Sequence, residues 1–471
     1  VFPFQIAAPD GVSTATALAG GAVRGAAPIA SSGVPALAGI RPWRTARTSQ
    51  IIPCALVTGW AFLVYLNALG NGFRLDDPYR VTGNPGVENL MPIWRHFTDP
   101  YTSSFLPSLA QYRPLLPLSL SINHALTGNS VAGYHLGNLL LAVAAALMVY
   151  VLVRELLGYW TAERLSSRRV DFLAAAVALL MATHPVGGML VNYISGRDLL
   201  LMQIFLGASL FFTIRMRRMS LSVKPDEVLG ASPVRRLARR WFGGSVLGWA
   251  GVLLLFELAL LAKAQAVMFP GLILAFELTL GRGTLTRIAT YTRALPFALV
   301  AAGHLIFIDS YLGFAALPDA PNIGQDALWP YPLTQAKLSL FHYLANFAWP
   351  FDLHQMPVEP TMNSLQDPSV AIGLSFIVAT LACAWLLRRA NPLLAFCILA
   401  YWIAQSPESS VTPMLHNATD YRPYPASPFL FLLLALILNR YLRPAAATIV
   451  LLGLIVFFSA ASVHMNAGWS A

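Results

Sequence analysis

The chain has 471 residues, of which 56% are hydrophobic and only 11% are charged. A soluble domain usually carries about 25% charged residues, so a water-covered globular protein is excluded and lipid must cover much of the surface. The formal net charge of +10 does not require a nucleic acid as partner. It is explained by basic loops on one side of a membrane, as the positive-inside rule describes.

The first 50 residues are rich in Ala, Gly, Pro and Ser and are expected to form a flexible cytoplasmic tail. Residues 51–465 are expected to form one transmembrane domain, because stretches of about 20 apolar residues can cross a bilayer as helices. We therefore predict an all-α polytopic membrane protein with about eleven transmembrane helices. The predicted spans are 51–70, 134–155, 171–186, 193–214, 244–262, 266–281, 294–313, 368–388, 391–405, 426–440 and 444–463.

Basic residues concentrate in the predicted loops 156–170 and 215–243, whereas the opposite loops hold few. This split places the N-terminus in the cytoplasm and the active face on the periplasmic or luminal side, and alanine-rich spans fit a bacterial inner membrane. The first outer loop, 71–133, is large and is expected to carry short amphipathic helices. The second, 314–367, contains a segment at 333–349 that predicts a helix lying on the membrane.

The first outer loop begins with two adjacent carboxylates, Asp76 and Asp77. Adjacent carboxylates at a membrane surface are solvated, paired or functional. In the simplest interpretation they begin a solvated loop. In a catalytic interpretation, one accepts the proton of an attacking hydroxyl while the other orients that hydroxyl or binds a cation.

Further along this loop, Tyr112 precedes Arg113, whose guanidinium can hold a phosphate through two hydrogen bonds. His135 and Asn138 follow at the outer end of a span, about one helical turn apart and on the same side. A histidine in this position also fits a purely structural hydrogen bond.

Polar residues also mark the outer ends of later spans. His184 ends one span, and Arg197 and Asp198 begin the next, where they can equally form an ion pair that stabilises the helix start. Lys263 lies between two closely linked spans. The segment 416–425 adds Asp420 and Arg422 among aromatic residues. Together these residues predict acid, base and phosphate-binding groups on one face of the membrane.

The order of several motifs resembles the opening of the transmembrane and tetratricopeptide-repeat O-mannosyltransferase-like proteins, which are part of the GT-C glycosyltransferase superfamily. The motifs are DD at 76–77, NP at 84–85, WRHFTDPY at 94–101, YRPL at 112–115, NHALTG at 123–128 and GYHLGNLLL at 133–141. Weaker similarity continues through ATHPV, SGRDLL, LAKAQ, FAWPFDL and DYRPYPAS, so the resemblance covers residues 51–440.

The resemblance implies a GT-C-like membrane glycosyltransferase that moves a sugar from a polyprenyl- or dolichyl-phosphate donor to a hydroxyl acceptor, a protein Ser/Thr or a glycan. It assigns catalysis to Asp76 and Asp77 and donor-phosphate binding to Arg113 and Arg197, to which we add Lys263 and Arg422. The expected supporting residues are Tyr112, His135, Asn138, His184, Asp198 and Asp420. Expected partners are the lipid-linked sugar, membrane lipids and the acceptor, with further membrane subunits in the alternative below. The sequence identifies no particular cofactor, and the use of a divalent cation stays an open alternative.

Two departures favour an alternative function. The family usually continues with a His-Thr-Glu run where this chain has Val186 onwards, and with an acid where Ala264 follows the lysine. In this alternative the chain is a catalytically degenerate relative that serves as a structural or assembly subunit of a membrane complex. A transporter is disfavoured, because the polar residues gather at the outer ends of the spans and not at mid-span.

Overall fold

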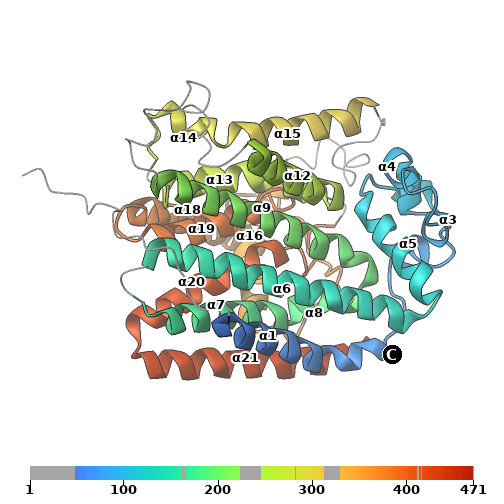
Figure 1. Ribbon diagram of the computed structural model, residues 1–471, viewed down its shortest axis with the longest axis horizontal. Coiled ribbons are helices and arrows are strands. Elements are labelled where there is room, and N and C mark those ends of the chain that lie inside the picture. The colour runs from blue at the N-terminus through green and yellow to red at the C-terminus, as the bar shows by residue number, and fades with distance from the viewer. Residues whose placement is uncertain are drawn as a thin grey trace, which may run out of the picture. The chain divides into compact units, whose positions relative to one another are not determined.

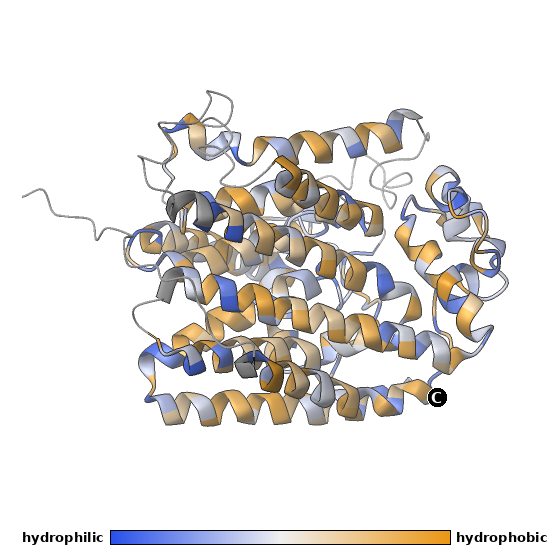
Figure 2. Cartoon of the chain, viewed as in Figure 1, coloured by the Kyte–Doolittle hydropathy of each residue, from blue (hydrophilic) through white to orange (hydrophobic). Residues whose placement is uncertain are grey.

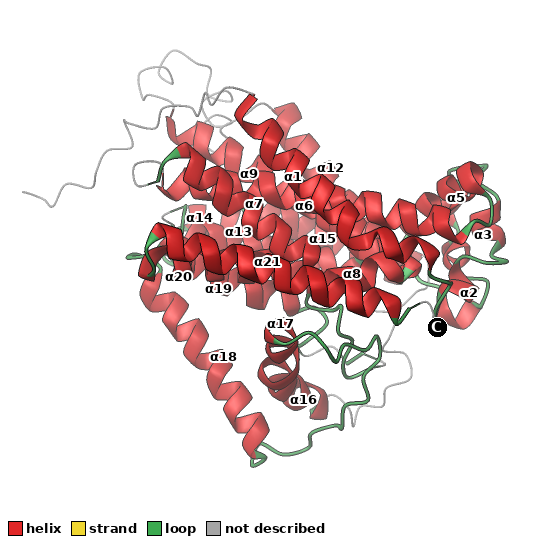
Figure 3. Cartoon of the chain, turned by 90° about the horizontal axis from the view of Figure 1, so that it is seen from below, coloured by secondary structure: helices red, strands yellow, loops and turns green. Residues whose placement is uncertain are grey.

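The computed structural model describes residues 48–161, 165–222, 246–281, 283–311, 329–410, 413–414 and 416–469. The predicted tail 1–50, except for its last three residues, lies outside these ranges, as do residues 223–243 of the basic loop 215–243 and residues 314–328 of the outer loop 314–367. Within these ranges all regular structure is helical (Figure 3). The all-α prediction is therefore confirmed.

Six helices, some extended by an adjoining turn, are long and apolar enough to cross a membrane. Each corresponds to a predicted span, which supports an integral membrane protein. They are α1 (Thr48–Tyr65), α6 (Val131–Thr161), α9 (Arg197–Ser222), α18 (Pro368–Leu387), α20 (Ser427–Tyr441) and α21 (Pro444–Ala467).

The predicted count of about eleven spans is not confirmed. The helices α7 (Ser167–Thr183) and α8 (Pro185–Asn192) reach the required length only as a pair, and that pair is bent by 55°. Four other predicted spans form shorter apolar helices, because turns and helix breaks interrupt their apolar runs. These are α12 (Val246–Ala262), α13 (Phe269–Leu278), α15 (Leu295–Ile306) and α19 (Pro392–Gln405).

The long helices pack side by side (Figure 1). Helix α6 lies against α7 and α9, and α9 lies against α12, while α7 also packs on α1, α20 and α21. Apolar side chains between these helices form one large buried cluster. Figure 2 shows that apolar residues run along most of the length of these helices, as expected of helices that pack on one another and face lipid.

Local sequence explains several helix starts. Ser166 accepts a hydrogen bond from the N–H of Arg169 at the start of α7, and Asp367 accepts one from Ser369 at the start of α18. Pro368 occupies the first turn of α18, where a missing N–H costs nothing. At the bend between α7 and α8, the ring of His184 accepts the N–H of Val186. Short polar side chains before apolar runs thus fix where these helices begin.

The first outer loop folds into the predicted series of short helices. The longest, α5, packs on α3 and α6, and residues of this loop form a separate small apolar cluster together with Tyr134 and Ile194. The loop is therefore a folded cap over one end of α6 and α9. Its elements are η2 (Leu66–Gly70) at its entry, then α2 (Asp77–Arg80), α3 (Pro85–Glu88), α4 (Arg95–Thr98), η3 (Pro100–Ser103), η4 (Pro107–Leu109) and α5 (Leu115–Thr127).

The second outer loop contains a continuous helical run over 330–348, where a helix is predicted at 333–349. It consists of α16 (Pro330–Leu338), the π-helical turn η9 (Ser339–Leu344) and α17 (Ala345–Ala348). Helix α16 packs on α18. Its position at the membrane surface stays a prediction. The remaining short elements are η5 (Ile194–Gly196), η6 (Ala264–Met268), α14 (Ile288–Thr292), η7 (Phe307–Tyr311) and η10 (Tyr424–Ala426).

Candidate functional site

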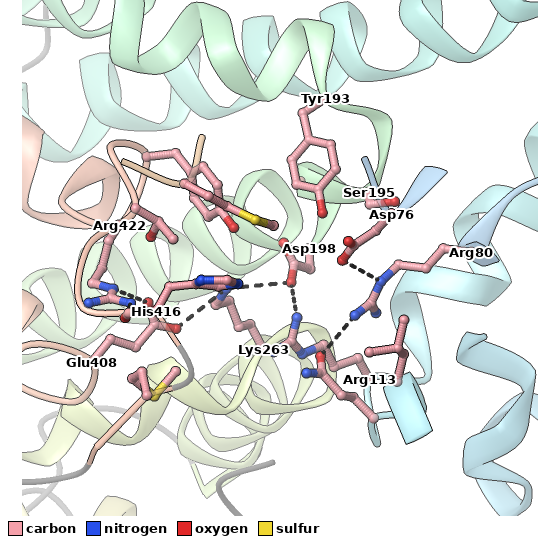
Figure 4. A pocket seen from close by; sticks show the side chains of 17 residues that line it. Asp76, Arg80, Arg113, Tyr193, Ser195, Asp198, Lys263, Glu408, His416 and Arg422 are labelled. Atoms are coloured by element: carbon pink, nitrogen blue, oxygen red, sulfur yellow. Dashed lines mark hydrogen bonds and ion pairs between the residues drawn. The ribbon is translucent and has the colours of Figure 1, made fainter. Parts of the chain in front are cut away.

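A cavity of about 180 Å³ lies where the first outer loop meets the ends of the long helices (Figure 4). Its walls come from segments that are far apart in the sequence, including α2, residues 109–113 before α5, the α8–α9 junction and the segment before η10. Five predicted site residues line it, namely Asp76, Arg113, Asp198, Lys263 and Arg422. The fold therefore brings together groups that the sequence places up to 346 positions apart.

Asp76 reaches the cavity from a strained turn. The preceding Leu75 has φ of 51°, the left-handed conformation that residues other than glycine seldom adopt. Asp76 then stands at the N-terminal end of α2, and its Oδ2 lies 3.2 Å from Nε of Arg80, one turn later. Its side chain is 28% exposed. The turn thus presents one ionisable carboxylate to the cavity beside a guanidinium.

The neighbouring Asp77 points away from the cavity and is fully buried. Its carboxylate accepts hydrogen bonds from the N–H and Oγ–H of Ser195 at 2.8 and 2.7 Å and from the N–H of Arg74 at 3.0 Å. Burial raises the pKa of Asp77 to about 6, although these hydrogen bonds oppose the shift. Asp77 therefore ties the turn carrying Asp76 to the start of α9, and its oxygens already have partners.

Opposite Asp76, two cations share the carboxylate of Asp198. Nη1 of Arg113 lies 2.7 Å from Oδ2 of Asp198, and Nζ of Lys263 lies 3.6 Å from the same oxygen. The other oxygen of Asp198 accepts the N–H of Leu199 at 2.6 Å. Arg113 comes from the first outer loop and Lys263 from the break between α12 and η6, where its backbone is extended. Asp198 thus anchors two cations from separate segments at the start of α9.

A second carboxylate, Glu408, continues this chain of charges. It lies 3.4 Å from Nζ of Lys263 and 3.7 Å from Nε of Arg422. Arg422 is 3% exposed, and its Nη groups donate to Tyr331 Oη and to the carbonyl of His416 at 3.2 and 3.1 Å. The remaining guanidinium nitrogen of Arg422, Nε, faces Glu408 and has no hydrogen-bond partner among the described residues.

The electrostatics of the cavity favour an anionic ligand. Its lining contains four Lys or Arg side chains and three Asp or Glu side chains. Two guanidinium atoms at its wall, Nη1 of Arg80 and Nε of Arg422, are buried without a hydrogen-bond partner. Buried charged donors that lack partners are costly, and a ligand with several acceptor oxygens would satisfy them. A phosphate group has this chemistry.

Arg197 does not line the cavity. It is 2% exposed and lies behind the wall, where its guanidinium donates to Asn138 Oδ1 at 2.6 Å and to Asn123 Oδ1 at 2.8 Å. It also donates to the carbonyls of Ser119 and Tyr134, both at 3.1 Å. This geometry gives the predicted phosphate-binding role of Arg197 no support. The side chain instead joins α5, α6 and α9 beneath the site.

Two predicted supporting residues belong to the same framework. The amide of Asn138 donates to the carbonyls of Leu190 and Tyr193 at 2.8 and 3.2 Å. Both ring nitrogens of His135 lie 3.0 and 3.1 Å from the carbonyls of Val191 and Asn71. These contacts position the segment that leads into α9. Asn138 and His135 therefore support a wall of the cavity from behind.

The other predicted supporting residues lie away from the cavity lining. Tyr112 donates to the carbonyl of Phe97 at 3.1 Å, and burial raises its pKa to about 12. His184 is packed among aromatic rings, with its ring centroid 4.5 Å from that of Phe458. Asp420 is paired with His342 and accepts the N–H of His354 at 2.7 Å. It therefore holds the second outer loop against the segment that carries Arg422.

Among the acidic, basic and histidine side chains that line the cavity, the sequence interpretation missed Arg80, Glu408 and His416. Arg80 follows Asp76 by four positions, a spacing that predicts an ion pair on a helix, so its role could have been recognised. Glu408 is a lone acid in a loop, and no local pattern distinguishes it. In the part of the chain that the structure describes, no group of three or more His, Cys, Asp or Glu side chains is arranged to hold a metal ion.

A second cavity, of about 490 Å³, adjoins the first and shares the lining residues Met356, Met414 and His416 with it. Its wall also includes Pro357 and Val358, whose side chain is 99% exposed. The two cavities therefore lie next to each other on either side of these shared residues.

The chain is similar over part of its length to proteins named protein O-mannosyl-transferase. It is 28% identical over 184 residues to one from Caenorhabditis elegans, which is 38% of this chain and 25% of that protein. It is 34% identical over 159 residues to human TMTC2, which is 32% of this chain and 17% of the relative. The match to Tmtc2 of Drosophila melanogaster is 31% over 159 residues, 33% of this chain and 16% of that protein.

The chain therefore spans a quarter or less of the length of these relatives. No protein-family model matches it. The resemblance to the O-mannosyltransferase-like proteins that the motifs predict is confirmed by these similarities.

Proposed function

We propose that this chain is a membrane glycosyltransferase that transfers a sugar from a polyprenyl-phosphate donor to a hydroxyl acceptor on the non-cytoplasmic face. The observation that carries the proposal is that the carboxylate of Asp76 and the cations Arg113 and Lys263 line the same cavity (Figure 4). The similarity to proteins named O-mannosyl-transferases supports a glycosyltransferase. The apolar helices of the fold and the cations that line the cavity support a lipid-phosphate carrier for the donor.

In the proposed reaction the acceptor oxygen attacks the anomeric carbon of the sugar and forms the new glycosidic bond. The bond from that carbon to the phosphate oxygen breaks, and its electron pair stays on the phosphate. Asp76 takes the acceptor's proton. Arg113 and Lys263, with Nε of Arg422, stabilise the charge that develops on the leaving phosphate, since fixed cations in a low-dielectric site act strongly on such charge. The sugar passes through an oxocarbenium-like state.

A direct test measures the release of polyprenyl phosphate from polyprenyl-phosphate mannose by the purified full-length chain with threonine-containing peptides. Mannose is the first choice because of the names of the similar proteins, and glucose, galactose and N-acetylglucosamine donors follow. Release that depends on an acceptor supports the proposal. Absence of release with every donor, together with absence of binding of polyprenyl phosphate itself, rejects it.

Arg113 is expected to bind the donor phosphate. Arg113→Lys keeps the charge but loses the planar fork, and Arg113→Ala loses both. We expect donor affinity to fall at least about tenfold in Arg113→Ala, since a hydrogen bond to a charged group contributes about 1.5–3 kcal/mol, and by less in Arg113→Lys. Titration with a fluorescent polyprenyl-phosphate analogue measures this. Arg95→Lys, an exposed arginine of the same loop, is the control. Unchanged affinity in both Arg113 variants would rule out this role.

The proposed face of the membrane gives a topological prediction. The loops 156–170 and 215–243 should lie on the cytoplasmic side, opposite 71–133. Single cysteines are placed at 105 and 220 in a variant that lacks Cys54, Cys383 and Cys397 and are labelled from outside intact cells. Labelling at 105 and not at 220 is expected. The opposite pattern would place the site in the cytoplasm and contradict the proposal.

A second candidate function is a catalytically degenerate subunit of a membrane complex. It is favoured by the closed charge arrangement, in which Arg113 and Lys263 already pair with resident carboxylates, and by the departures at Val186 and Ala264. A cell with Asp76→Asn and no glycan defect, in which deletion of the chain destabilises another membrane protein, would support this function and reject the enzyme.

A further inference from the structure

Glu408 lines the cavity, but neither the motifs nor the proposed reaction gives it a role. It lies in the turn that follows α19, and its carboxylate stands between Lys263 and Arg422 (Figure 4). Both of these cations are buried, at 6% and 3% exposure. Without Glu408, two buried positive charges would face one cavity with only Asp198 nearby to compensate Lys263.

The two carboxylates that neutralise this end of the cavity are held very differently. Asp198 is fixed by a 2.7 Å contact to Arg113 and by the N–H of Leu199 at 2.6 Å. Within the part of the chain that the structure describes, the carboxylate of Glu408 makes only the two longer ion pairs, at 3.4 and 3.7 Å. Charge-assisted hydrogen bonds are usually about 2.7–2.9 Å long. The carboxylate of Glu408 therefore neutralises Lys263 and Arg422 but forms no short hydrogen bond with either of them.

The anchoring of Glu408 is in its backbone. Tyr331 Oη donates to the carbonyl oxygen of Glu408 at 2.6 Å, and the N–H of Glu408 reaches the carbonyl of Gln405 at 3.3 Å. The main chain is thus held in place while the side chain extends from it to the cations. Rotation of the side chain away from the cavity would leave this backbone anchoring intact.

An incoming phosphate could make contacts that Glu408 does not make. Nε of Arg422 is buried without a hydrogen-bond partner, and Lys263 carries three donor hydrogens. A phosphate group has several acceptor oxygens, so it can bridge both cations at hydrogen-bond distance. The exchange replaces two loose ion pairs by hydrogen-bonded ones and keeps the cations neutralised.

We propose that Glu408 is a resident counter-ion that holds Lys263 and Arg422 in the empty site and gives way to the phosphate group of the ligand. This inference rests on the proposed function, since it assumes that the ligand is a prenyl phosphate. As a positioning residue, Glu408 competes with every phosphate that enters. Its return to the cations after transfer displaces the leaving prenyl phosphate and frees the site.

The test compares Glu408→Gln with the wild-type full-length chain, using farnesyl phosphate as the probe. The substitution keeps the shape of the side chain and removes its charge. We expect farnesyl phosphate to bind about tenfold more tightly, which corresponds to about 1.4 kcal/mol, and to inhibit transfer at correspondingly lower concentration. Glu88→Gln, an exposed glutamate in the first outer loop, makes the same change in charge and should alter binding less than about twofold.

Equal or weaker binding of farnesyl phosphate by folded Glu408→Gln overturns the inference, and the proposed function stands if the wild type still transfers sugar. If the wild type neither binds farnesyl phosphate nor transfers sugar, the proposed function itself has failed. Should Glu408→Gln not fold, Glu408→Asp withdraws the carboxylate by one methylene and lengthens both ion pairs. It should then bind the probe two- to threefold more tightly, as a weaker competitor does, and unchanged affinity would again overturn the inference.

Discussion

Replacing Asp76 by Asn is expected to lower turnover at least about 10²-fold while leaving donor affinity nearly unchanged, because general-base assistance contributes about 10²–10⁴-fold. The amide keeps the shape of the carboxylate but cannot accept the acceptor's proton. Donor affinity should persist because the phosphate is assigned to Arg113 and Lys263, across the cavity from Asp76. The rate of polyprenyl-phosphate release at saturating donor measures the effect.

The matched control is Asp99→Asn. Asp99 lies in the same outer loop and accepts the N–H of Tyr101 at 3.0 Å, a hydrogen bond that an asparagine side chain can also accept. It does not line the cavity, so its turnover should match the wild type. If Asp76→Asn and Asp99→Asn have equal turnover, Asp76 is not the base. If Asp76→Asn instead weakens donor binding tenfold with little change in turnover, its carboxylate acts in binding, through Arg80, and not in proton transfer.

Some features of the candidate site could be predicted from the sequence, whereas others depend on how distant segments pack together. The motif at 76–77 predicted an acidic pair, and the structure separates its members. Asp76 faces the cavity, whereas Asp77 is buried and paired with Ser195. Two adjacent residues at a helix start point in different directions, and which one faces the ligand depends on where the α8–α9 junction lies. That junction is 118 positions away, so the local pattern could not decide it.

Arg113, Arg197 and Lys263 were equivalent as cations in the sequence. Arg113 and Lys263 line the cavity, whereas Arg197 is surrounded by acceptors from α5 and α6. The two asparagines that accept hydrogen bonds from Arg197, Asn123 and Asn138, occur in motifs that carry the family resemblance. Their role as partners of an arginine becomes visible only when the helices are packed. Glu408 carries no motif at all, and its position follows from the fold.

The number of membrane spans also depends partly on packing, which the sequence pattern does not reveal. Hydropathy located every long apolar helix, because burial in lipid needs a continuous apolar run. It also placed a break at Lys263 between two predicted spans, and the structure has this residue extended between α12 and η6. Whether the shorter helices cross, dip into or merely cover the bundle depends on their packing against neighbours.

Removal of the Arg197 side chain is expected to impair folding more than binding. In Arg197→Met the apolar stem persists, but Asn138 Oδ1, Asn123 Oδ1 and two carbonyls lose their donor in the protein interior. Breaking a buried charged network of this kind typically costs about 3–5 kcal/mol, and each buried acceptor left without a donor adds to the loss. Arg197→Lys should fall between Arg197→Met and the wild type, since one ammonium group cannot reach all four acceptors.

The measurement that separates the two roles of Arg197 is thermal unfolding in detergent, read alongside farnesyl-phosphate binding. We expect the midpoint of Arg197→Met to fall by on the order of 3–6 °C, while the protein that remains folded binds the probe with near wild-type affinity. Arg168→Met, at an exposed arginine of α7, should leave both quantities unchanged. A variant with a wild-type midpoint and at least tenfold weaker probe binding would instead assign Arg197 to the phosphate. The contacts beneath the site would then have to rearrange when the donor binds, because the cavity wall now lies between this guanidinium and the ligand.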